Sequence, residues 1–193
     1  MVKKICLFTI VFLFYLSARS FAEVGLSIKA QGTYGILLKP DIQELGLPEE
    51  KLTKGGLTFS GQLLYRPAGE IVSFGVEVGY IDCWRDAYTD PGSGERVEIN
   101  LSAVPILAII QLESRLPYLQ IGAGLYRLTS KIAVLSVDQK RRDTRLGLMF
   151  AAGAAIPLDP KLNLDLGGKL HMILTEDEST ILLSPALGIL LRF

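Results

Sequence analysis

The fold of this chain is decided by its last seven residues, Leu187-Gly188-Ile189-Leu190-Leu191-Arg192-Phe193. Successive side chains of a β-strand point to opposite faces. Here every second residue is apolar, and the alternate set includes a glycine and an arginine. This alternation predicts a strand with one apolar face. Its apolar set is Leu187, Ile189, Leu191 and Phe193.

The first 22 residues have a different pattern. Lys3 and Lys4 precede an apolar run over 5–16, and Ser20-Phe21-Ala22 provides the small residues that a signal peptidase recognises. A membrane-anchoring helix would need about 20 apolar residues, so the run is too short for one. The pattern predicts a secretory signal peptide over 1–22 that is cleaved after export.

The expected mature chain, 23–193, has the length of one domain. The signal peptide holds three of the 20 basic residues and none of the 20 acidic ones, so the mature net charge is about −3. No strongly basic surface indicates nucleic acid. Cys83 is the only mature cysteine and His171 the only histidine. An intrachain disulfide is therefore excluded, most metal sites and catalytic triads are disfavoured, and no cofactor is expected.

After the signal peptide, no apolar run has the length of a membrane helix. Apolar residues instead alternate with polar ones in eight segments, each long enough for a tilted strand, which needs about 9–11 residues to cross a bilayer. This rhythm predicts an all-β fold, an eight-stranded antiparallel up-and-down transmembrane β-barrel with lipid outside and polar residues in the lumen. The expected strands are 24–38, 56–66, 71–84, 97–112, 117–129, 144–156, 161–174 and 181–193.

The fourth of these segments is the hardest to phase. Its first half predicts that Val97, Ile99 and Leu101 face outward, because Glu98, Asn100 and Ser102 alternate with them. The rest, 104–112, is apolar on both faces and has no readable phase.

The expected connections alternate in length. Those over 39–55, 85–96 and 130–143 are long, that over 175–180 is intermediate, and the other three are tight. Long outer loops and short periplasmic turns are typical of outer-membrane barrels. An even number of strands also places both chain ends on the periplasmic side.

Three stretches resemble the small bacterial outer-membrane β-barrels of the OmpA/OmpX type: 101–107, 117–125 and 187–193. The chain departs from that family at Leu191, where an aromatic residue is common. The resemblance implies a bacterial outer-membrane location, and a terminal strand that the barrel-assembly machinery recognises through Leu187, Ile189, Leu191 and Phe193. Because that family includes adhesins, structural barrels, narrow pores and lipid enzymes, the fold leaves the function open.

Five charged residues fall on the inward faces of the expected strands. An eight-stranded barrel is only wide enough for side chains to fill. Buried charges need partners, because an uncompensated one is strongly destabilising. We therefore expect a structural charge network in the lumen, with an ion path as the alternative. Its members are Lys29, Glu77, Arg145, Asp165 and Lys169.

His171 is a weak catalytic candidate. It is expected on the inward face near the outer end, where Ser184 could approach it and Glu176 or Glu178 could orient it. Lipid A deacylases of the outer membrane place a histidine and a serine on neighbouring positions. Here Ile173 stands two residues further on, so a hydrogen-bonded lumen histidine is favoured over an active site.

Two charged stretches lie in the expected loops: the basic Lys140-Arg141-Arg142 and the acidic Glu176-Asp177-Glu178. They are solvated charges or contacts to partners such as lipopolysaccharide phosphates, which suit Arg and Lys. We expect a monomeric, non-enzymatic barrel whose extracellular loops serve a structural, surface-interaction or adhesion role, with outer-membrane lipid and lipopolysaccharide as partners. The alternatives are a narrow, porin-like channel for ions or small solutes, a lipid A-modifying enzyme, and a soluble ligand-binding barrel.

Overall fold

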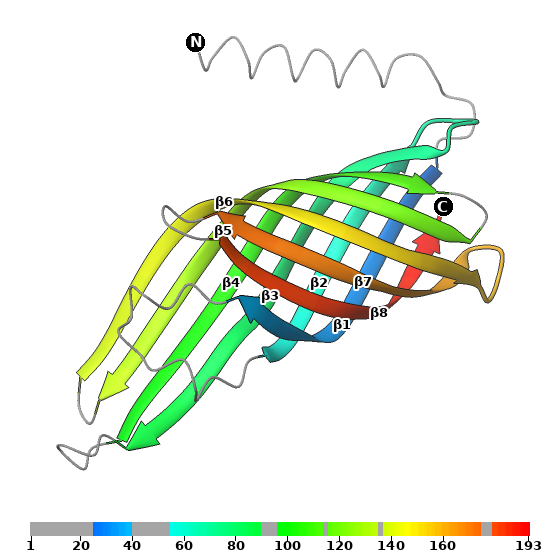
Figure 1. Cartoon of the computed structure of the whole chain (residues 1–193). Helices are drawn as coiled ribbons and strands as arrows, with labels where there is room; N and C mark the ends of the chain where they lie inside the picture. The colour runs from blue at the N-terminus through cyan, green and yellow to red at the C-terminus, as the bar shows by residue number, and fades with distance from the viewer. Residues whose placement is uncertain (1–24, 40–54, 90–95, 114–115, 135–136, 175–178) are drawn as a thin grey trace, which may run out of the picture.

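The structure is a computed structural model that describes residues 25–39, 55–89, 96–113, 116–134, 137–174 and 179–193. Eight antiparallel strands form a closed barrel in chain order (Figure 1). Among the described residues, no helix is long and apolar enough to cross a membrane. The predicted fold class is confirmed. The strands are β1 (Gly25–Lys39), β2 (Gly55–Arg66), β3 (Val72–Thr89), β4 (Arg96–Glu113), β5 (Pro117–Val134), β6 (Val137–Pro157), β7 (Leu162–Leu174) and β8 (Ser179–Arg192).

The C-terminal strand closes the barrel. β8 pairs with β7 on one side and with β1 on the other, where Leu191 lies opposite Ile28. The pairing continues past β8, because the Phe193 N–H donates to the Leu26 carbonyl at 2.8 Å. The connection from β2 to β3 is the expected tight turn, and in it Gly69 adopts a φ of 74°, a left-handed conformation that favours glycine.

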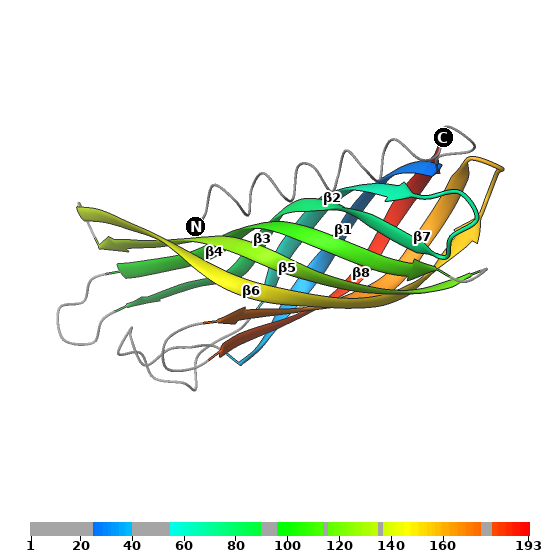
Figure 2. The same ribbon diagram turned by 90° about the horizontal axis from the view of Figure 1, so that it is seen from above.

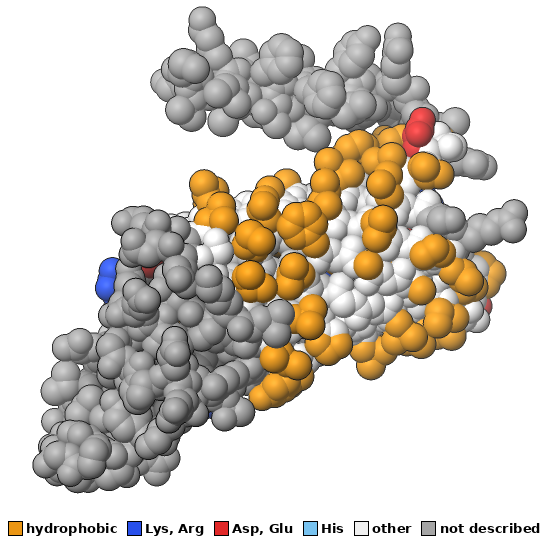
Figure 3. Space-filling model, in the orientation of Figure 1, with side chains coloured by type: hydrophobic (Ala, Val, Ile, Leu, Met, Phe, Trp, Pro, Cys, Tyr) orange, Lys and Arg blue, Asp and Glu red, His pale blue; other side chains and the backbone are white. Residues whose placement is uncertain are grey.

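The outer surface is apolar. Leu187, Ile189, Leu191 and Phe193 are 57, 51, 39 and 64% exposed. Large exposed apolar side chains come from all eight strands, and Figure 3 shows them over the visible face of the barrel. Soluble monomers rarely expose so continuous an apolar surface. A barrel that has lipid as its outer solvent requires one.

Three strands are longer than the sequence predicted by four residues or more. In the segments expected as loops, residues 85–89 continue β3, 130–134 continue β5 and 137–143 belong to β6, while β4 begins at Arg96. Pairing of β2 with β3 stops at Ile81, and pairing of β6 with β7 stops at Gly147. Beyond these rows the four strands form a sheet that projects past the rim at the end opposite the tight turns (Figures 1 and 2). We call it the four-stranded extension: residues 82–89, 96–102, 127–134 and 137–146.

The predicted outward orientation of Leu101 is wrong. The register between β4 and β5 is unbroken from Val97 to Glu113, so β4 keeps one phase. Its odd-numbered residues face the lumen, where Leu107 is buried and Leu101 packs against the same core. The alternation of apolar and polar residues predicts the wrong face here because the lumen lining is itself apolar at this height. The same prediction for Val97 and Ile99 concerns side chains that are outside the described part of the structure.

A buried apolar cluster lines the lumen, and most of it lies on the outer side of Glu77 and Lys169, although Leu64 and Ile109 lie toward the tight turns. On strands that run toward the outer end, Ile81 follows Glu77 on β3 and Ile173 follows Lys169 on β7, each by four residues. Tyr126 is fully buried and lies over Gly147, where an added Cβ would come within 2.6 Å of its ring. We call this cluster the apolar layer: Leu64, Ile81, Cys83, Ala103, Leu107, Ile109, Tyr126, Met149, Ala151, Ile173 and Leu182.

Candidate functional site

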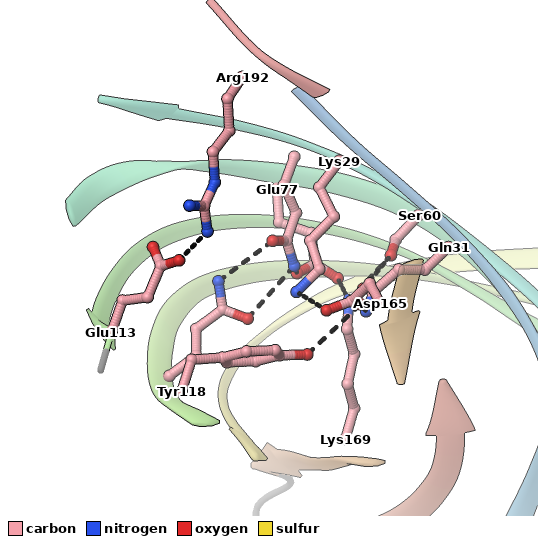
Figure 4. Close-up of polar contacts among 11 residues, drawn as sticks. Lys29, Gln31, Ser60, Glu77, Glu113, Tyr118, Asp165, Lys169 and Arg192 are labelled. Carbon is pink, nitrogen blue, oxygen red and sulfur yellow. Dashed lines mark hydrogen bonds and ion pairs between the residues drawn. The ribbon is translucent and has the colours of Figure 1, made fainter. Parts of the chain in front are cut away.

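Below most of the apolar layer, toward the tight turns, polar side chains from several strands meet in the centre of the barrel (Figure 4). Alternation brings them there, because each occupies an inward position of its strand. We call this set the lumen network: Lys29 and Gln31 of β1, Ser60 and Gln62 of β2, Glu77 of β3, Tyr118 and Gln120 of β5, and Asp165 and Lys169 of β7.

Two ion pairs form the centre of the lumen network. Lys29 Nζ lies 3.0 Å from Asp165 Oδ1, and Lys169 Nζ lies 2.6 Å from Glu77 Oε1. No side chain of the four is more than 4% exposed. The two ammonium groups and two carboxylates cancel, so the buried network is electrically neutral. Each charge therefore has the partner that burial requires.

Neutral side chains join the two pairs. Lys169 Nζ donates to Ser60 Oγ at 2.8 Å, and Ser60 Oγ donates to Gln31 Oε1 at 3.5 Å. The Gln31 amide in turn donates to Asp165. Ser60 and Gln31 thus connect the Lys169–Glu77 ion pair to the Lys29–Asp165 ion pair.

Two further contacts extend the lumen network across the barrel. Gln62 Nε2 donates to Glu77 at 2.5 Å, and the amides of Gln62 and Gln120 lie 3.2 Å apart. The Tyr118 hydroxyl donates to Asp165 at 3.4 Å, and Lys29 Nζ lies 3.9 Å from the centre of the Tyr118 ring. A cation over an aromatic face is an attractive contact, so Tyr118 holds both members of the Lys29–Asp165 pair.

The structure brings together four of the five charged residues that the sequence placed in the network. The fifth, Arg145, forms a 2.6 Å ion pair with Asp143 of its own strand, in the four-stranded extension. The alternation assigns a face but not a height along the barrel, and β6 begins well before the predicted start at 144. The amide and hydroxyl members of the network were detectable by the same alternation, since all lie at inward positions.

The inner mouth of the barrel has a separate charged cluster. Glu113 of β4 accepts hydrogen bonds from Arg66 of β2, at 3.4 Å, and from Arg192 of β8. The carboxylate is 7% exposed and each arginine is 30% exposed. This inner-mouth cluster links three strands near the tight turns, in partial contact with water.

Among the described residues, the hydrogen-bond partner found for His171 is a tyrosine and not Ser184. His171 Nδ1 lies 2.9 Å from the Tyr126 hydroxyl, and the two rings pack edge to face. Ser184 lies opposite Lys169 in the register, whereas His171 lies opposite Leu182. Within the described part of the chain, neither His171 Nε2 nor Ser184 Oγ has a hydrogen-bond partner. Glu176 and Glu178 lie outside the described residues.

A closed antiparallel barrel with an apolar outside and a polar network inside defines a class, the small transmembrane β-barrels. No protein-family model matches the chain, and no curated protein matches it by sequence. Similar proteins are found among the solved structures.

Three of these structures each align with 89% of this chain and with 100% of their own. A major outer membrane protein from Thermus thermophilus gives a TM-score of 0.61 at 15% identity. Ail, the attachment invasion locus protein of Yersinia pestis, solved with the heparin analogue sucrose octasulfate, gives 0.57 at 15%. Neisserial surface protein A gives 0.54 at 14%. The fold is that of the small outer-membrane barrels of the OmpA/OmpX type, as the sequence predicted.

Proposed function

We propose that this protein is a non-conducting, non-enzymatic barrel of a bacterial outer membrane, with a structural or attachment role at the cell surface that its outer end performs. The observation that supports this most is the filled lumen. Most of the apolar layer lies beyond the lumen network toward the outer end, and the largest side chains of both are buried. This arrangement supports a plug over an ion path.

An ion crossing such a barrel would meet two barriers of different kinds. In the lumen network it would have to separate Lys29 from Asp165 or Lys169 from Glu77, leaving charges unpaired. In the apolar layer it would lose its hydration with little in return, because side chains such as Leu107, Met149 and Leu182 offer no polar partner.

The outer-membrane location is supported by the apolar outer surface and by the location of the similar proteins. A signal peptide over 1–22 would direct export, and those residues lie outside the described part of the chain. The terminal set Leu187, Ile189, Leu191 and Phe193 would be read by the barrel-assembly machinery, since all four side chains face outward on the closing strand.

The surface role is supported by the four-stranded extension. It raises paired strands beyond the rim, at the end where an outer-membrane barrel faces the exterior, and so provides an ordered platform for contact. Two similar proteins bear names that refer to attachment or to the cell surface, which agrees with this role.

The first test is conductance. Purified protein in planar bilayers is expected to give no steady current, and a steady ion-selective current in the wild type would favour the channel instead. A lipid A mass assay on cells that express the protein tests the enzyme alternative, and loss of an acyl chain that depends on His171 would overturn the proposal.

The second test is orientation. In a Cys83→Ala background, Lys140→Cys in the four-stranded extension should react with a membrane-impermeant maleimide on intact cells. The matched control is Glu70→Cys, an exposed position in the β2–β3 turn, which should react only after lysis. The opposite pattern would place the extension in the periplasm.

A further inference from the structure

The seam between the first and last strands, β1 and β8, lacks pairing over three rows. Among the described residues, 33–35 of β1 form no pairs with 184–186 of β8, although pairing is present on both sides of this gap. The register is the same before and after the gap. The two strands therefore stay aligned through it, and hydrogen bonds are missing rather than residues.

A proline accounts for the gap. The Phe193 N–H donates to the Leu26 carbonyl, and hydrogen-bonded rows recur at every second residue of an antiparallel pair. At this spacing the row of Tyr34 and Pro185 is a hydrogen-bonded one, and proline has no N–H to donate. The Tyr34 carbonyl therefore has no donor in the ladder, although a wall that spans a membrane needs every backbone polar group satisfied.

Two buried hydroxyls lie on the lumen side of this gap. Ser184 Oγ and Thr58 Oγ1 have no hydrogen-bond partner within the described part of the chain, and the two residues are 0 and 5% exposed. Both hydroxyls converge on Gly35, because a Cβ added there would lie 3.0 Å from each oxygen. The lumen side of Gly35 is thus lined by two hydroxyls, next to the carbonyl of the preceding residue.

A second proline gap in the wall is filled differently. The pairing of β3 with β4 skips the row of Gly79 and Pro105. Pro105 is buried, and a Cβ added at Gly79 would lie 3.3 Å from its ring. There the proline ring itself lies on the lumen side, whereas Pro185 is exposed on the outer surface. The polar surroundings of the β1–β8 gap are therefore not a general result of a proline in the wall.

We propose that Gly35, Ser184, Thr58 and the Tyr34 carbonyl form a binding site for one buried water molecule in the barrel wall. The water donates to the Tyr34 carbonyl in place of the missing proline N–H. It donates its second hydrogen to one hydroxyl and accepts from the other, so all three protein groups gain a partner. A buried water usually makes about three hydrogen bonds of this kind.

The chemistry of the site favours water over a cation. Its three groups are neutral oxygens, and two of them can donate as well as accept, whereas a cation uses acceptors only. The site also adjoins the lumen network. Ser184 lies opposite Lys169 in the register, and Thr58 is two residues from Ser60, whose hydroxyl accepts from Lys169. This inference is independent of the surface role, and it gives water a structural part in closing the barrel.

Crystal structures of the barrel at a resolution that shows ordered water test the proposal. In wild type we expect a water within about 2.5–3.0 Å of the Tyr34 carbonyl and of both hydroxyls. Gly35→Ala should remove this water, because the added Cβ comes between the two hydroxyls and the carbonyl. Gly61→Ala is the matched control on the neighbouring strand. A Cβ at Gly61 meets nothing within 4 Å, so this variant should keep the water.

Two further variants keep the test decisive if Gly35→Ala fails to fold. Ser184→Ala combined with Thr58→Val removes both hydroxyls and should also lose the water. Pro185→Ala supplies the missing N–H, which should bond to the Tyr34 carbonyl and exchange slowly with solvent. The water should then no longer contact that carbonyl.

Oxygen-17 relaxation dispersion on nanodiscs makes the same comparison in a bilayer, and Gly35→Ala should hold one long-lived water fewer than Gly61→Ala. Three results would overturn the proposal. One is a wild-type structure without this water. Another is a direct hydrogen bond from Ser184 Oγ to Thr58 Oγ1 or to His171 Nε2. The third is an occupant that disappears when sodium and potassium are removed, which would assign the site to a cation instead.

Discussion

The lumen network and the apolar layer fill the same barrel by different physics. In the network, Lys169 and Glu77 are stable in the interior only because each has the other, and a change at one member leaves the partner as an uncompensated charge. In the apolar layer, Leu107 and Ile173 stabilise the fold through the apolar surface that they remove from water and through their van der Waals contacts. The burial of one apolar side chain does not depend on any single apolar neighbour.

This difference separates two ways of closing a narrow barrel. The network is specific, because amides and hydroxyls such as Gln62 and Ser60 fix each charge in one place. The apolar layer fixes no charge in place, and it excludes ions and water. A substitution should therefore cost stability for a different reason in each region, an unpaired charge in the network and a cavity in the apolar layer.

The largest effect is expected from Glu77→Gln. The variant keeps the shape of the side chain but leaves Lys169 buried without a counter-charge. We expect the free energy of unfolding in lipid vesicles to fall by about 3–5 kcal/mol, measured by denaturant titration. Glu70→Gln, at an exposed turn position, is the control and should change little. A loss at position 77 below about 1 kcal/mol, the usual value for a solvated pair, would mean that water reaches the pair and that the lumen is open.

A similar or slightly smaller effect is expected from Leu107→Ala in the apolar layer. Leu107 is 1% exposed, so the truncation leaves a cavity rather than an unpaired charge. Burial losses of this kind cost about 2–5 kcal/mol, and we expect a value of about 3 kcal/mol. The same vesicle titration measures it, with Leu119→Ala on the lipid-facing side of β5 as the control. A negligible cost at 107 would show that the apolar layer is loosely packed.

The two lumen regions were not equally predictable from sequence. Strand alternation revealed the polar one, because a charged residue such as Lys29 or Asp165 among outward leucines has only one reasonable face. The apolar layer was missed, although the sequence held its signal: the run 104–110 is apolar on both faces because both surroundings, lipid and lumen, are apolar there. The same property made the assignment of Leu101 wrong.

Strand ends were predicted less well than strand faces. The segments 85–96 and 130–143 are rich in charged and turn-forming residues, which in a soluble protein would indicate loops. In the structure their described parts, 85–89 with Arg96 and 130–134 with 137–143, are paired strands above the apolar surface, where alternation of apolar and polar residues is no longer needed. The displacement of Arg145 from the lumen network has the same origin. The local sequence pattern shows whether a residue faces the lumen or the outside. Its height along the barrel axis follows only from the pairing of the strands.

A sharper comparison replaces the whole ion pair. If Glu77 is changed to Leu and Lys169 to Met together, no charge is left unpaired, and the polar region becomes an extension of the apolar one. Exchanges of this kind are often near neutral, so we expect a loss of about 0–2 kcal/mol, well below that of Glu77→Gln alone. A double-mutant cycle measures the coupling. Additive losses from the two single changes would show that Glu77 and Lys169 act independently.

The smallest effect is expected at the inner mouth, where the same chemistry meets water. Arg66 is 30% exposed, and Glu113 keeps Arg192 as a second partner when Arg66 is removed. Arg66→Gln should therefore lower the free energy of unfolding by only about 0.2–1 kcal/mol. Because exposed pairs are screened by salt, the difference between Arg66→Gln and wild type should shrink further at about 1 M salt, whereas the loss caused by Glu77→Gln should persist. The measurement is the same vesicle titration at two salt concentrations. If both losses fell equally with salt, the network around Glu77 would be as accessible to ions as the mouth, and the distinction between a sealed polar core and a solvated rim would fail.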